Sequence, residues 1–339
     1  MHDMGPFFRN KQHSTEKRMI MYPLKLKYYA KTALWGGDTL KNCWGKTCNF
    51  DKLAETWELT VRTAENNTIE NGEHAGLLLK DYLRQNPSAI SPAGNSEDFP
   101  LLIKFIDARD DLSVQVHPND TFAADVENDR GKTEMWYIVE AAPNAEIIYG
   151  LREGVSSEDF ARAIHEGRTL EVLHRVKVKA GETYFIPSGE VHAIGAGCLI
   201  AEIQQNSDLT YRVYDYDRVG ADGKKRELHV EKAAAVSSPF DEASINAIRF
   251  ANKPRFYAGE CLASCHYFEV HRLTAEHLPM ALAATGDSFH HILCVDGEGE
   301  ILHRGNAYPL HRGDSYFLPA GMGDYSLRGV ATILLSTQS

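Results

Sequence analysis

The chain has 339 residues, of which 43% are hydrophobic, and a formal net charge of −11. That length can form one large hydrophobic core or two modest ones. The acidic balance and the lack of clustered Lys and Arg argue against a nucleic-acid partner. No apolar run reaches the roughly 20 residues that span a bilayer, and the N-terminus lacks the apolar core of a secretory signal. We therefore expect a cytoplasmic protein with no membrane partner, in which residues 1–20 form a disordered extension or tag.

In chain order, the first helical pattern covers residues 73–85, and the Pro-, Ser- and Asn-rich residues 86–98 after it predict a loop. A second helix is predicted over residues 156–166, where Ser156 and Asp159 are suited to cap its N-terminus. Most other patterned segments are short, rich in β-branched or aromatic residues, and bounded by Gly, Pro or Asn, which is typical of strands. These segments read VQVH, MWYIVE, AEIIYGL, VLHRVKVKAG, TYFIPSG, CLIAEIQQ and TYRVYDYD.

An internal repeat indicates how the chain is organised. Residues 180–192 read AGETYFIPSGEVH and residues 312–324 read RGDSYFLPAGMGD, so both copies contain G-x5-P-x-G. In each copy an apolar strand leads into a tight turn that contains Pro and Gly. Two copies of one strand-turn unit predict two related β domains, which we place at residues 21–240 and 241–339.

In the first copy the turn is followed by His192, and the pattern G-x5-P-x-G-x2-H resembles the second motif of the cupin family. Cupins are small antiparallel jelly-roll barrels that often hold a metal ion in the mouth. The resemblance implies a mainly β fold of two cupin barrels with inserted helices. In the second copy Asp324 stands at the corresponding position, and the adjacent His290 and His291 point to opposite faces of a strand. We therefore expect the second barrel to be metal-free and structural.

Three further residues can join His192 at a metal ion. Gln115 and His117 are two apart on a predicted strand and so share one face, and Glu134 begins an otherwise apolar strand. Each residue alone has an ordinary explanation, because a His beside a strand is more often a hydrogen-bonding partner and a Glu at a strand start is usually solvated. Together the four form a nitrogen and oxygen ligand set suited to zinc and acceptable to iron or manganese. This set predicts an open, catalytic metal site.

The segments LSVQVHPND and GKTEMWYI, followed by the His-bearing turn and TYRVYDYDR, resemble the type I mannose-6-phosphate isomerases, and most closely their short bacterial form. The resemblance covers essentially residues 21–339. It implies an aldose–ketose isomerase that interconverts mannose 6-phosphate and fructose 6-phosphate through an enediol. It also implies one Zn²⁺ per chain, bound by Gln115, His117, Glu134 and His192.

The same resemblance implies roles for residues around the substrate. Arg212 and Lys132 would lie in the sugar-phosphate pocket, where a cationic grip suits the phosphate dianion. Lys104 matches a pocket lysine linked to proton transfer, and Glu202 and Asp208 fall at acidic positions near the arginine. Glu202, Asp208, Lys104 and a zinc-bound water all stay open as the base that moves a proton between C1 and C2. Without the motif, ordinary ion pairs would explain Lys104, Arg212 and Asp208.

One position departs from the family pattern, because Gly131 stands where longer members carry a His before the pocket lysine. Two other classes of protein fit the motifs. An iron-dependent cupin dioxygenase could use the same ligands, but it would depend on oxygen and need no phosphate grip. A non-catalytic sugar-binding cupin is the other, and the acidic charge disfavours a DNA-bound regulatory form of it. The expected partner is a small sugar phosphate, and the expected state is a monomer or homodimer.

Overall fold

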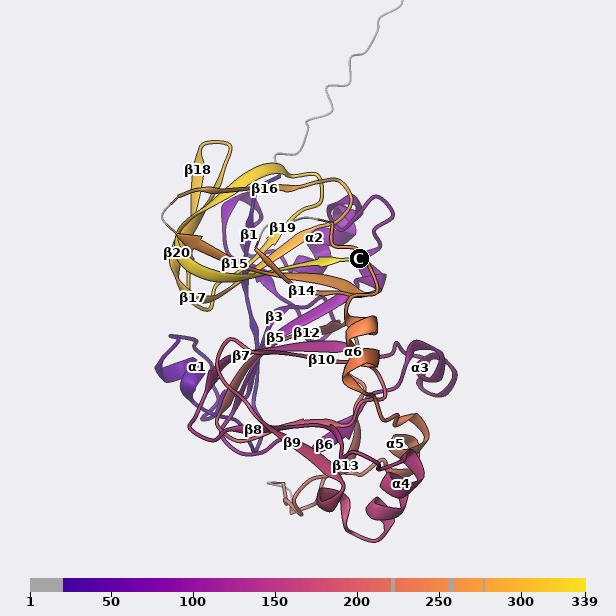
Figure 1. Cartoon of the computed structure of the whole chain (residues 1–339). Helices are drawn as coiled ribbons and strands as arrows, with labels where there is room; N and C mark the ends of the chain where they lie inside the picture. Colours follow the sequence, from indigo (N-terminus) through magenta and orange to yellow (C-terminus); the bar gives the residue numbers. More distant parts are fainter. Residues whose placement is uncertain (1–20, 221–222, 256–258, 277) are drawn as a thin grey trace, which may run out of the picture.

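The computed structural model describes residues 21–339 except 221–222, 256–258 and 277. The extension predicted over residues 1–20 lies outside the described residues. Within the described part, strands dominate and form three antiparallel sheets (Figure 1). The prediction of a mainly β fold is confirmed, whereas its arrangement as two cupin barrels stays a prediction.

Two sheets face each other and carry the predicted site. The six-stranded sheet has the order β10-β7-β12-β5-β3-β2, and the five-stranded sheet has the order β13-β6-β11-β8-β9. A buried apolar cluster between them includes Ile138 and Ile200 of the first sheet and Ile147 and Ile194 of the second. The strands of the first sheet are β2 (Tyr29–Lys31), β3 (Glu55–Leu59), β5 (Leu101–Ala108), β7 (Glu134–Ala141), β10 (Thr183–Ile186) and β12 (Cys198–Gln205). Those of the second are β6 (Val114–Val116), β8 (Glu146–Leu151), β9 (Leu173–Lys177), β11 (His192–Ile194) and β13 (Tyr211–Tyr214).

The third sheet has nine strands, and its main path runs β14-β15-β20-β17-β19-β1-β4. Two N-terminal strands therefore complete a sheet of C-terminal strands, and Leu24 of β1 pairs with Phe317 of β19. A second apolar cluster, with Ala201 and Phe268 among its members, joins this sheet to the outer face of the six-stranded sheet. The boundary between residues 240 and 241 stays a prediction. The strands are β1 (Leu24–Lys27), β4 (Thr68–Ile69), β14 (Glu260–Ser264), β15 (Phe268–Glu276), β16 (Met280–Ala284), β17 (His290–His303), β18 (Asn306–His311), β19 (Ser315–Leu318) and β20 (Gly323–Gln338).

Helices surround the sheets, and α4 and α5 lie side by side next to β6 and β13 (Figure 1). Phe160 of α4 and Ala233 of α5 share a buried cluster with Val116 and Val213, whose side chains point away from the space between the sheets. In the described residues, no helix is both long and apolar enough to cross a membrane. The α-helices are α1 (Thr39–Asn42), α2 (Leu79–Gln85), α3 (Asp120–Glu127), α4 (Ser157–His165), α5 (Val230–Val236) and α6 (Glu242–Arg249). Short 3-10 helices are η1 (Gly72–His74), η2 (Pro87–Ala89), η3 (Ser96–Asp98) and η4 (Thr169–Glu171).

The two helix predictions had different outcomes. Helix α4 follows Ser156, and the side chains of Ser156 and Asp159 form the expected capping box. The helix predicted over residues 73–85 is wrong in its first half, because Gly76 has a φ of +88°, which no right-handed α-helix contains. Only α2 remains of it.

The repeat in the sequence is also a repeat in the structure. Strands β10 and β19 occupy the same place in the two copies, and each is followed by a glycine with positive φ, +94° at Gly189 and +77° at Gly321. Residues with a side chain rarely adopt this conformation, so the turn requires glycine. In the first copy the turn delivers His192 to the start of β11, whereas Asp324 of the second copy is exposed.

Candidate active site

The five-stranded sheet brings three predicted residues into one row. His192 on β11 is directly opposite Gln115 on β6, and Gln115 is directly opposite Arg212 on β13. Opposed residues of antiparallel strands project from the same face. That face is the one toward the six-stranded sheet, since Ile194, two residues after His192, lies in the core between the sheets. His117 follows Gln115 by two residues and so points the same way.

The six-stranded sheet supplies the opposing wall. Glu202 on β12 is opposite both Lys104 on β5 and Trp136 on β7. Glu134 is the first residue of β7, two residues before Trp136, and so shares its face. All of these residues are buried, with exposed fractions of 0% for Glu134 and 2% for Glu202. Titratable groups from both sheets therefore meet inside the molecule, away from bulk water.

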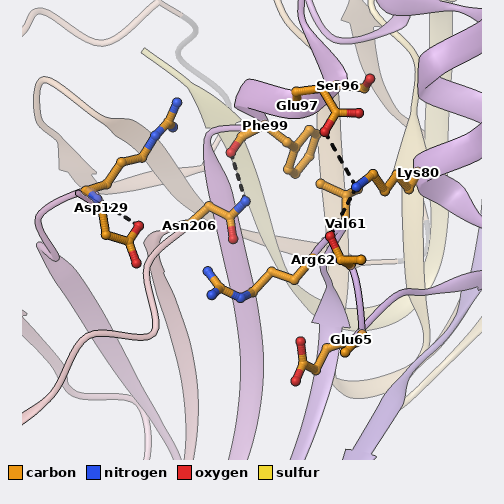
Figure 2. Close-up of a pocket in the computed structure, with 12 residues that line it drawn as sticks. Val61, Arg62, Glu65, Lys80, Ser96, Glu97, Phe99, Asp129 and Asn206 are labelled. Carbon is orange, nitrogen blue, oxygen red and sulfur yellow. Dashed lines mark hydrogen bonds and ion pairs between the residues drawn. The ribbon is translucent and has the colours of Figure 1, made fainter. Parts of the chain in front are cut away.

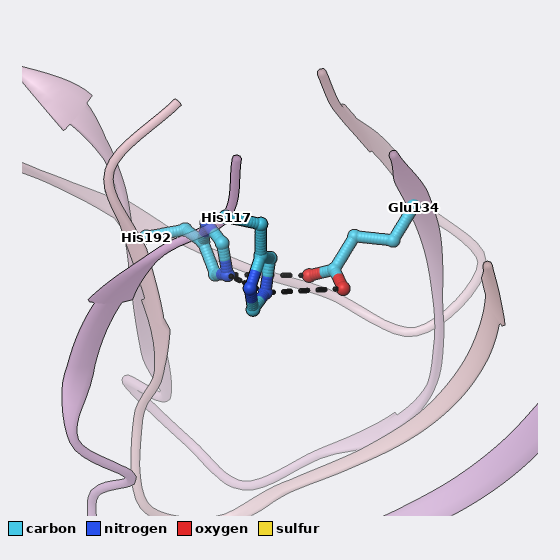
Figure 3. Close-up of side chains that lie close together, drawn as sticks. All are labelled: His117, Glu134 and His192. Atoms are coloured by element: carbon cyan, nitrogen blue, oxygen red, sulfur yellow. Dashed lines mark hydrogen bonds and ion pairs between the residues drawn. The ribbon is translucent and has the colours of Figure 1, made fainter. Parts of the chain in front are cut away.

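His117, Glu134 and His192 form a compact cluster of potential metal ligands (Figure 3). One ligand atom from each lies within 4.8 Å of the others. Glu134 Oε1 is 3.3 Å from His192 Nε2, and Glu134 Oε2 is 3.5 Å from His117 Nε2. Figure 3 shows the imidazoles and the carboxylate approaching from opposite sides. In the part of the chain that the structure describes, no other group of three or more His, Cys, Asp or Glu is arranged in this way.

The hydrogen bonds of the two histidines prepare them to bind a cation. His117 Nδ1 is 2.8 Å from Leu209 O and His192 Nδ1 is 2.8 Å from Glu190 O, so each Nδ1 carries the proton. The two Nε2 atoms then face each other with lone pairs at 3.1 Å. Burial lowers the pKa of His117 well below its ordinary value and that of His192 to about 4, which keeps both rings neutral. Facing lone pairs repel each other unless a cation lies beside them, so the pair fits a metal ion.

Glu134 fits the same ion. Within the described residues neither of its oxygens accepts a hydrogen bond of normal geometry, although Oε2 is 3.0 Å from Lys132 Nζ. Burial and, after it, the charge of Glu202 raise the pKa of Glu134 to about 7. A cation on the free oxygens would favour the ionised carboxylate. The cluster thus offers two neutral nitrogens and one carboxylate to a divalent metal.

Two buried lysines, the buried Glu202 and the partly exposed Glu55 form an ionic network beside Glu134. Lys104 Nζ is 3.3 Å from Glu202 Oε1 and 3.7 Å from Glu55 Oε2. Lys132 Nζ is 4.0 Å from Glu202 Oε1. Burial acts to lower the pKa of Lys104, but the carboxylates of Glu55 and Glu202 outweigh it and the pKa is raised. Burial likewise acts to raise the pKa of Glu202, but Lys132 and Lys104 outweigh it and the pKa is lowered, so both partners are charged at neutral pH.

Arg212 and Asp208 lie toward the solvent. Arg212 Nε donates to Ser113 Oγ at 3.3 Å and its Nη1 donates to Glu227 O at 3.0 Å. Among the described residues its guanidinium forms no ion pair, which leaves its charge available to an anionic ligand. Asp208 is exposed, and its Oδ2 is 3.8 Å from Lys31 Nζ. Asp208 makes no direct contact with Lys104 among the described residues, but its charge adds to those of Glu55 and Glu202 in raising the pKa of Lys104.

Known proteins are similar to this chain in both sequence and fold. The family description "Phosphomannose isomerase type I, catalytic domain" matches residues 23–137, and "Mannose-6-phosphate isomerase, cupin domain" matches residues 260–338. Mannose-6-phosphate isomerase ManA of Bacillus subtilis is 37% identical over 319 residues, which cover 94% of this chain and 99% of that protein. The chain belongs to the type I mannose-6-phosphate isomerase family.

Further similar proteins extend the comparison. A mannose-6-phosphate isomerase of Streptococcus mutans is 40% identical over 216 residues, or 63% of this chain and 67% of that protein. The crystal structure of the mannose 6-phosphate isomerase from Bacillus subtilis matches with a TM-score of 0.81 and 32% identity, covering 93% of this chain and 99% of that one. A variant phosphomannose isomerase from Salmonella typhimurium has a TM-score of 0.74 at 16% identity, which shows a shared fold.

The backbone around Gly131 leaves no room for a larger side chain. A Cβ at this position would lie 2.5 Å from both Asn119 C and Asp120 N. The loop before Glu134 packs directly on the backbone that follows His117, so it has no room for an imidazole.

Two tryptophans to which the sequence motifs gave no role contact the network. Trp136 Nε1 donates to Glu202 Oε2 at 2.8 Å, and Trp57 Nε1 donates to Glu55 Oε2 at 2.6 Å. Lys104 Nζ lies 5.0 Å from the ring centroid of Trp57. A signal was present in the segments ETWEL and EMWYI, where each tryptophan follows a glutamate by two residues and so shares its face.

A separate hollow of about 410 Å³ opens near the end of the six-stranded sheet (Figure 2). None of the predicted site residues lines it. Cationic and acidic side chains alternate around it, and Lys80 Nζ is 3.6 Å from Glu97 Oε2. This hollow has no uniform charge for a phosphate, and we do not assign substrate to it. Polar residues in its lining include Arg62, Lys80, Glu97, Arg130 and Asn206.

His290 and His291, the adjacent histidines of the C-terminal sheet, each lie beside a hydroxyl group. His290 Nδ1 is 2.8 Å from Tyr325 Oη, and His291 Nε2 is 2.8 Å from Ser315 Oγ. Both histidines are buried, and each has a hydroxyl neighbour. That the second barrel is metal-free stays a prediction.

Proposed function

We propose that this chain interconverts mannose 6-phosphate and fructose 6-phosphate with one Zn²⁺ held by Gln115, His117, Glu134 and His192. The observation that carries the proposal is the buried cluster of two neutral imidazoles and one carboxylate in a member of this family. Gln115 completes the set because it is opposite His192 and on the same face. When bound, the ion supplies a Lewis acid that stabilises negative charge on the sugar oxygens O1 and O2.

We assign the substrate phosphate to Arg212. It lies two strands away from His192 in the same row, which corresponds to about 10 Å. That separation suits a ligand whose reacting carbons and phosphate are at opposite ends. A guanidinium with no ion pair among the described residues is free to bind a dianion through its planar fork. Ser113, whose Oγ is 3.3 Å from Arg212 Nε, adds a hydroxyl beside it.

Lys132 belongs, in our proposal, at the other end of the substrate. Its ion pairs with Glu134 and Glu202 favour a place beside the reacting carbons over the shared phosphate grip that the family resemblance implies. There its ammonium group would stabilise the enediolate charge in a site shielded from water.

We propose Glu202 Oε1 as the atom that accepts the proton between C1 and C2. This oxygen is buried and accepts no hydrogen bond of normal geometry among the described residues, whereas Oε2 is held by Trp136. The two nearby lysines keep the carboxylate ionised, as a base requires. Lys104 is charged and has no lone pair to offer, so it serves as the partner that steadies the base.

One experiment tests the core of this proposal. Metal content and a coupled assay for fructose 6-phosphate are measured before chelation, after chelation and after zinc is restored. About one zinc per chain, with activity that is lost and regained, is the expected result. Activity that is unchanged without oxygen separates an isomerase from a dioxygenase. A folded, zinc-loaded protein that shows no turnover of mannose 6-phosphate would refute the proposed function.

A further inference from the structure

Hydrogen bonds from its backbone N–H groups hold the loop that carries Lys132 in place. Three consecutive N–H groups of this loop donate to acceptors in two neighbouring segments. The bonds run from Gly131 to Asp120 Oδ1 (2.9 Å), from Lys132 to Pro118 O (3.0 Å) and from Thr133 to Gln205 Oε1 (2.8 Å). Pro118 and Asp120 come shortly after His117, and Gln205 ends β12. The loop is therefore tied both to the segment of one proposed metal ligand and to the strand of Glu202.

Asp120 is the centre of this arrangement. Besides the bond from Gly131, its Oδ1 accepts a hydrogen bond from Gln205 Nε2 at 3.0 Å. Its Oδ2 accepts one from Tyr267 Oη at 2.9 Å. Tyr267 lies between β14 and β15 and belongs to the C-terminal sheet region. One carboxylate thus joins the segment after His117, the lysine loop, the end of β12 and the C-terminal part of the chain.

We infer that Asp120 is a positioning residue for Lys132 and Glu134, and that Tyr267 lets the C-terminal region support this positioning. The inference rests on the proposed function, which gives Lys132 and Glu134 their roles. Asp120 acts through the backbone, because its carboxylate bonds the amide that immediately precedes Lys132. Glu134 follows the same loop without a break, so a shift of the loop displaces a proposed metal ligand as well as a lysine.

The size of the expected effect follows from geometry. Misplacing a reacting group by about 1 Å can cost about 100-fold in rate. D120A removes three hydrogen bonds, and we expect it to lower kcat by about 10- to 100-fold while KM for mannose 6-phosphate changes less than about threefold. D120N keeps an oxygen that accepts from Gly131 and an amide that donates to Tyr267, and should restore kcat to within about threefold of the wild type.

Matched controls separate positioning from general damage. Asp125 is an exposed residue of the same helix whose side chain has no hydrogen bond or ion pair among the described residues, so D125A should behave as wild type. Y267F removes one hydroxyl and should lower kcat by about fivefold, the equivalent of one hydrogen bond. In Y308F the lost hydroxyl forms no hydrogen bond in the described structure, so kcat should not change.

A double-mutant cycle provides the decisive readout. If Tyr267 acts only through Asp120, Y267F has no further effect on kcat once D120A is present. Metal retention against a chelator, measured in parallel, should weaken in D120A and not in D125A, because Glu134 follows the tethered loop. If D120A does not fold, the kcat of Y267F is compared with that of Y308F, and a lower kcat in Y267F alone supports the inference.

The outcomes also separate the inference from the proposed function. An active wild type in which Y267F matches Y308F, or in which the effects of D120A and Y267F multiply, would overturn the inference and leave the proposed function intact. A wild type without isomerase activity would overturn the proposed function, and the metal-retention comparison would still decide whether Asp120 positions Glu134.

Discussion

The Nε2 atoms of His117 and His192 face each other at 3.1 Å, while each Nδ1 lies 2.8 Å from a backbone carbonyl oxygen. The carbonyls, Leu209 O and Glu190 O, fix the tautomer of each ring. Both rings therefore present a lone pair toward Glu134. The three side chains can therefore bind a cation between them.

Loss of either imidazole is expected to release the metal. H117A and H192A should each lose most of the zinc on dialysis and lower kcat/KM by at least about 100-fold, because too few ligands remain to hold the ion in place. Zinc analysis and the coupled assay measure both effects. H266A replaces an exposed histidine outside the cluster and is the matched control. Full zinc content in either cluster variant would contradict the ligand assignment.

Metal affinity is expected to fall as the pH drops below 7. Burial and the charge of Glu202 raise the pKa of Glu134 to about 7, so in the metal-free protein this carboxyl is mostly ionised above that pH and mostly protonated below it. A proton and a metal ion compete for the same oxygens, so affinity should decrease about tenfold per pH unit between about pH 6.5 and about pH 5. His192, with a pKa of about 4, stays neutral over most of this range.

A titration with a metal-sensitive dye from about pH 8 to about pH 5 measures this dependence. E134Q cannot ionise at this position and should bind weakly with a nearly flat profile over the same range. A flat profile in the wild type would argue against Glu134 as a ligand.

The variant E202Q should lose turnover without losing metal. If Glu202 is the base, kcat should fall by about 100-fold or more, and KM should change little. The lost negative charge should also lower the pKa of Glu134, which the Glu202 carboxylate raises. Metal should therefore be retained to a lower pH than in the wild type. Near-normal kcat in a metal-loaded E202Q would return the role of the base to Asp208 or a zinc-bound water.

Changes at Arg212 should separate binding from chemistry. R212A is expected to raise KM for mannose 6-phosphate by at least about tenfold, and R212K should recover only part of this because an ammonium lacks the planar fork. Steady-state kinetics at several salt concentrations measure the effect. R109A changes an exposed arginine paired with Asp110 and serves as the control. Equal KM values in R212A and R109A would place the phosphate elsewhere.

Removal of one partner of a buried ion pair at the junction of the sheets should destabilise the fold. Lys46 Nζ is 2.6 Å from Glu58 Oε1 and 3.0 Å from Gly313 O. K46M leaves the Glu58 carboxylate buried without its partner and should lower the free energy of unfolding by about 3–5 kcal/mol. K253A, at an exposed lysine with no contact of this kind in the described residues, should change it by less than about 0.5 kcal/mol.

The pH dependence of this loss has a definite sign. Burial raises the pKa of Glu58, and loss of Lys46 removes the charge that opposes this rise. Folded K46M therefore holds a proton that the unfolded chain releases above its ordinary carboxyl pKa, so its stability falls as the pH rises. Urea unfolding at about pH 5 and about pH 8 should show the larger loss at the higher pH. A loss that is equal at both would mean that Glu58 does not titrate.

Strand alternation predicted which of these side chains share a face. The two-residue spacing of Gln115 and His117 requires a common face on any strand, and the structure places both on β6 or just beyond it. The repeat predicted the turn before His192 because Pro and Gly at those positions permit few other conformations. Local rules failed in the first half of residues 73–85, where the sequence has a helical pattern but the positive φ of Gly76 is not helical, so the α-helix begins only at Leu79.

By itself, the sequence determined the mainly β fold, the turn at His192 and the family to which the chain belongs, because these depend on spacing and on local backbone preferences. Only the tertiary structure decided which neighbours each charge has. The pairing of Lys132 with Glu202 and the bond from Tyr267 to Asp120 join residues that are distant in sequence. The lack of an ion pair at Arg212 among the described residues is likewise visible only in the folded chain. Electrostatic roles depend on distances of a few ångströms across the core, and strand register and sheet packing set those distances.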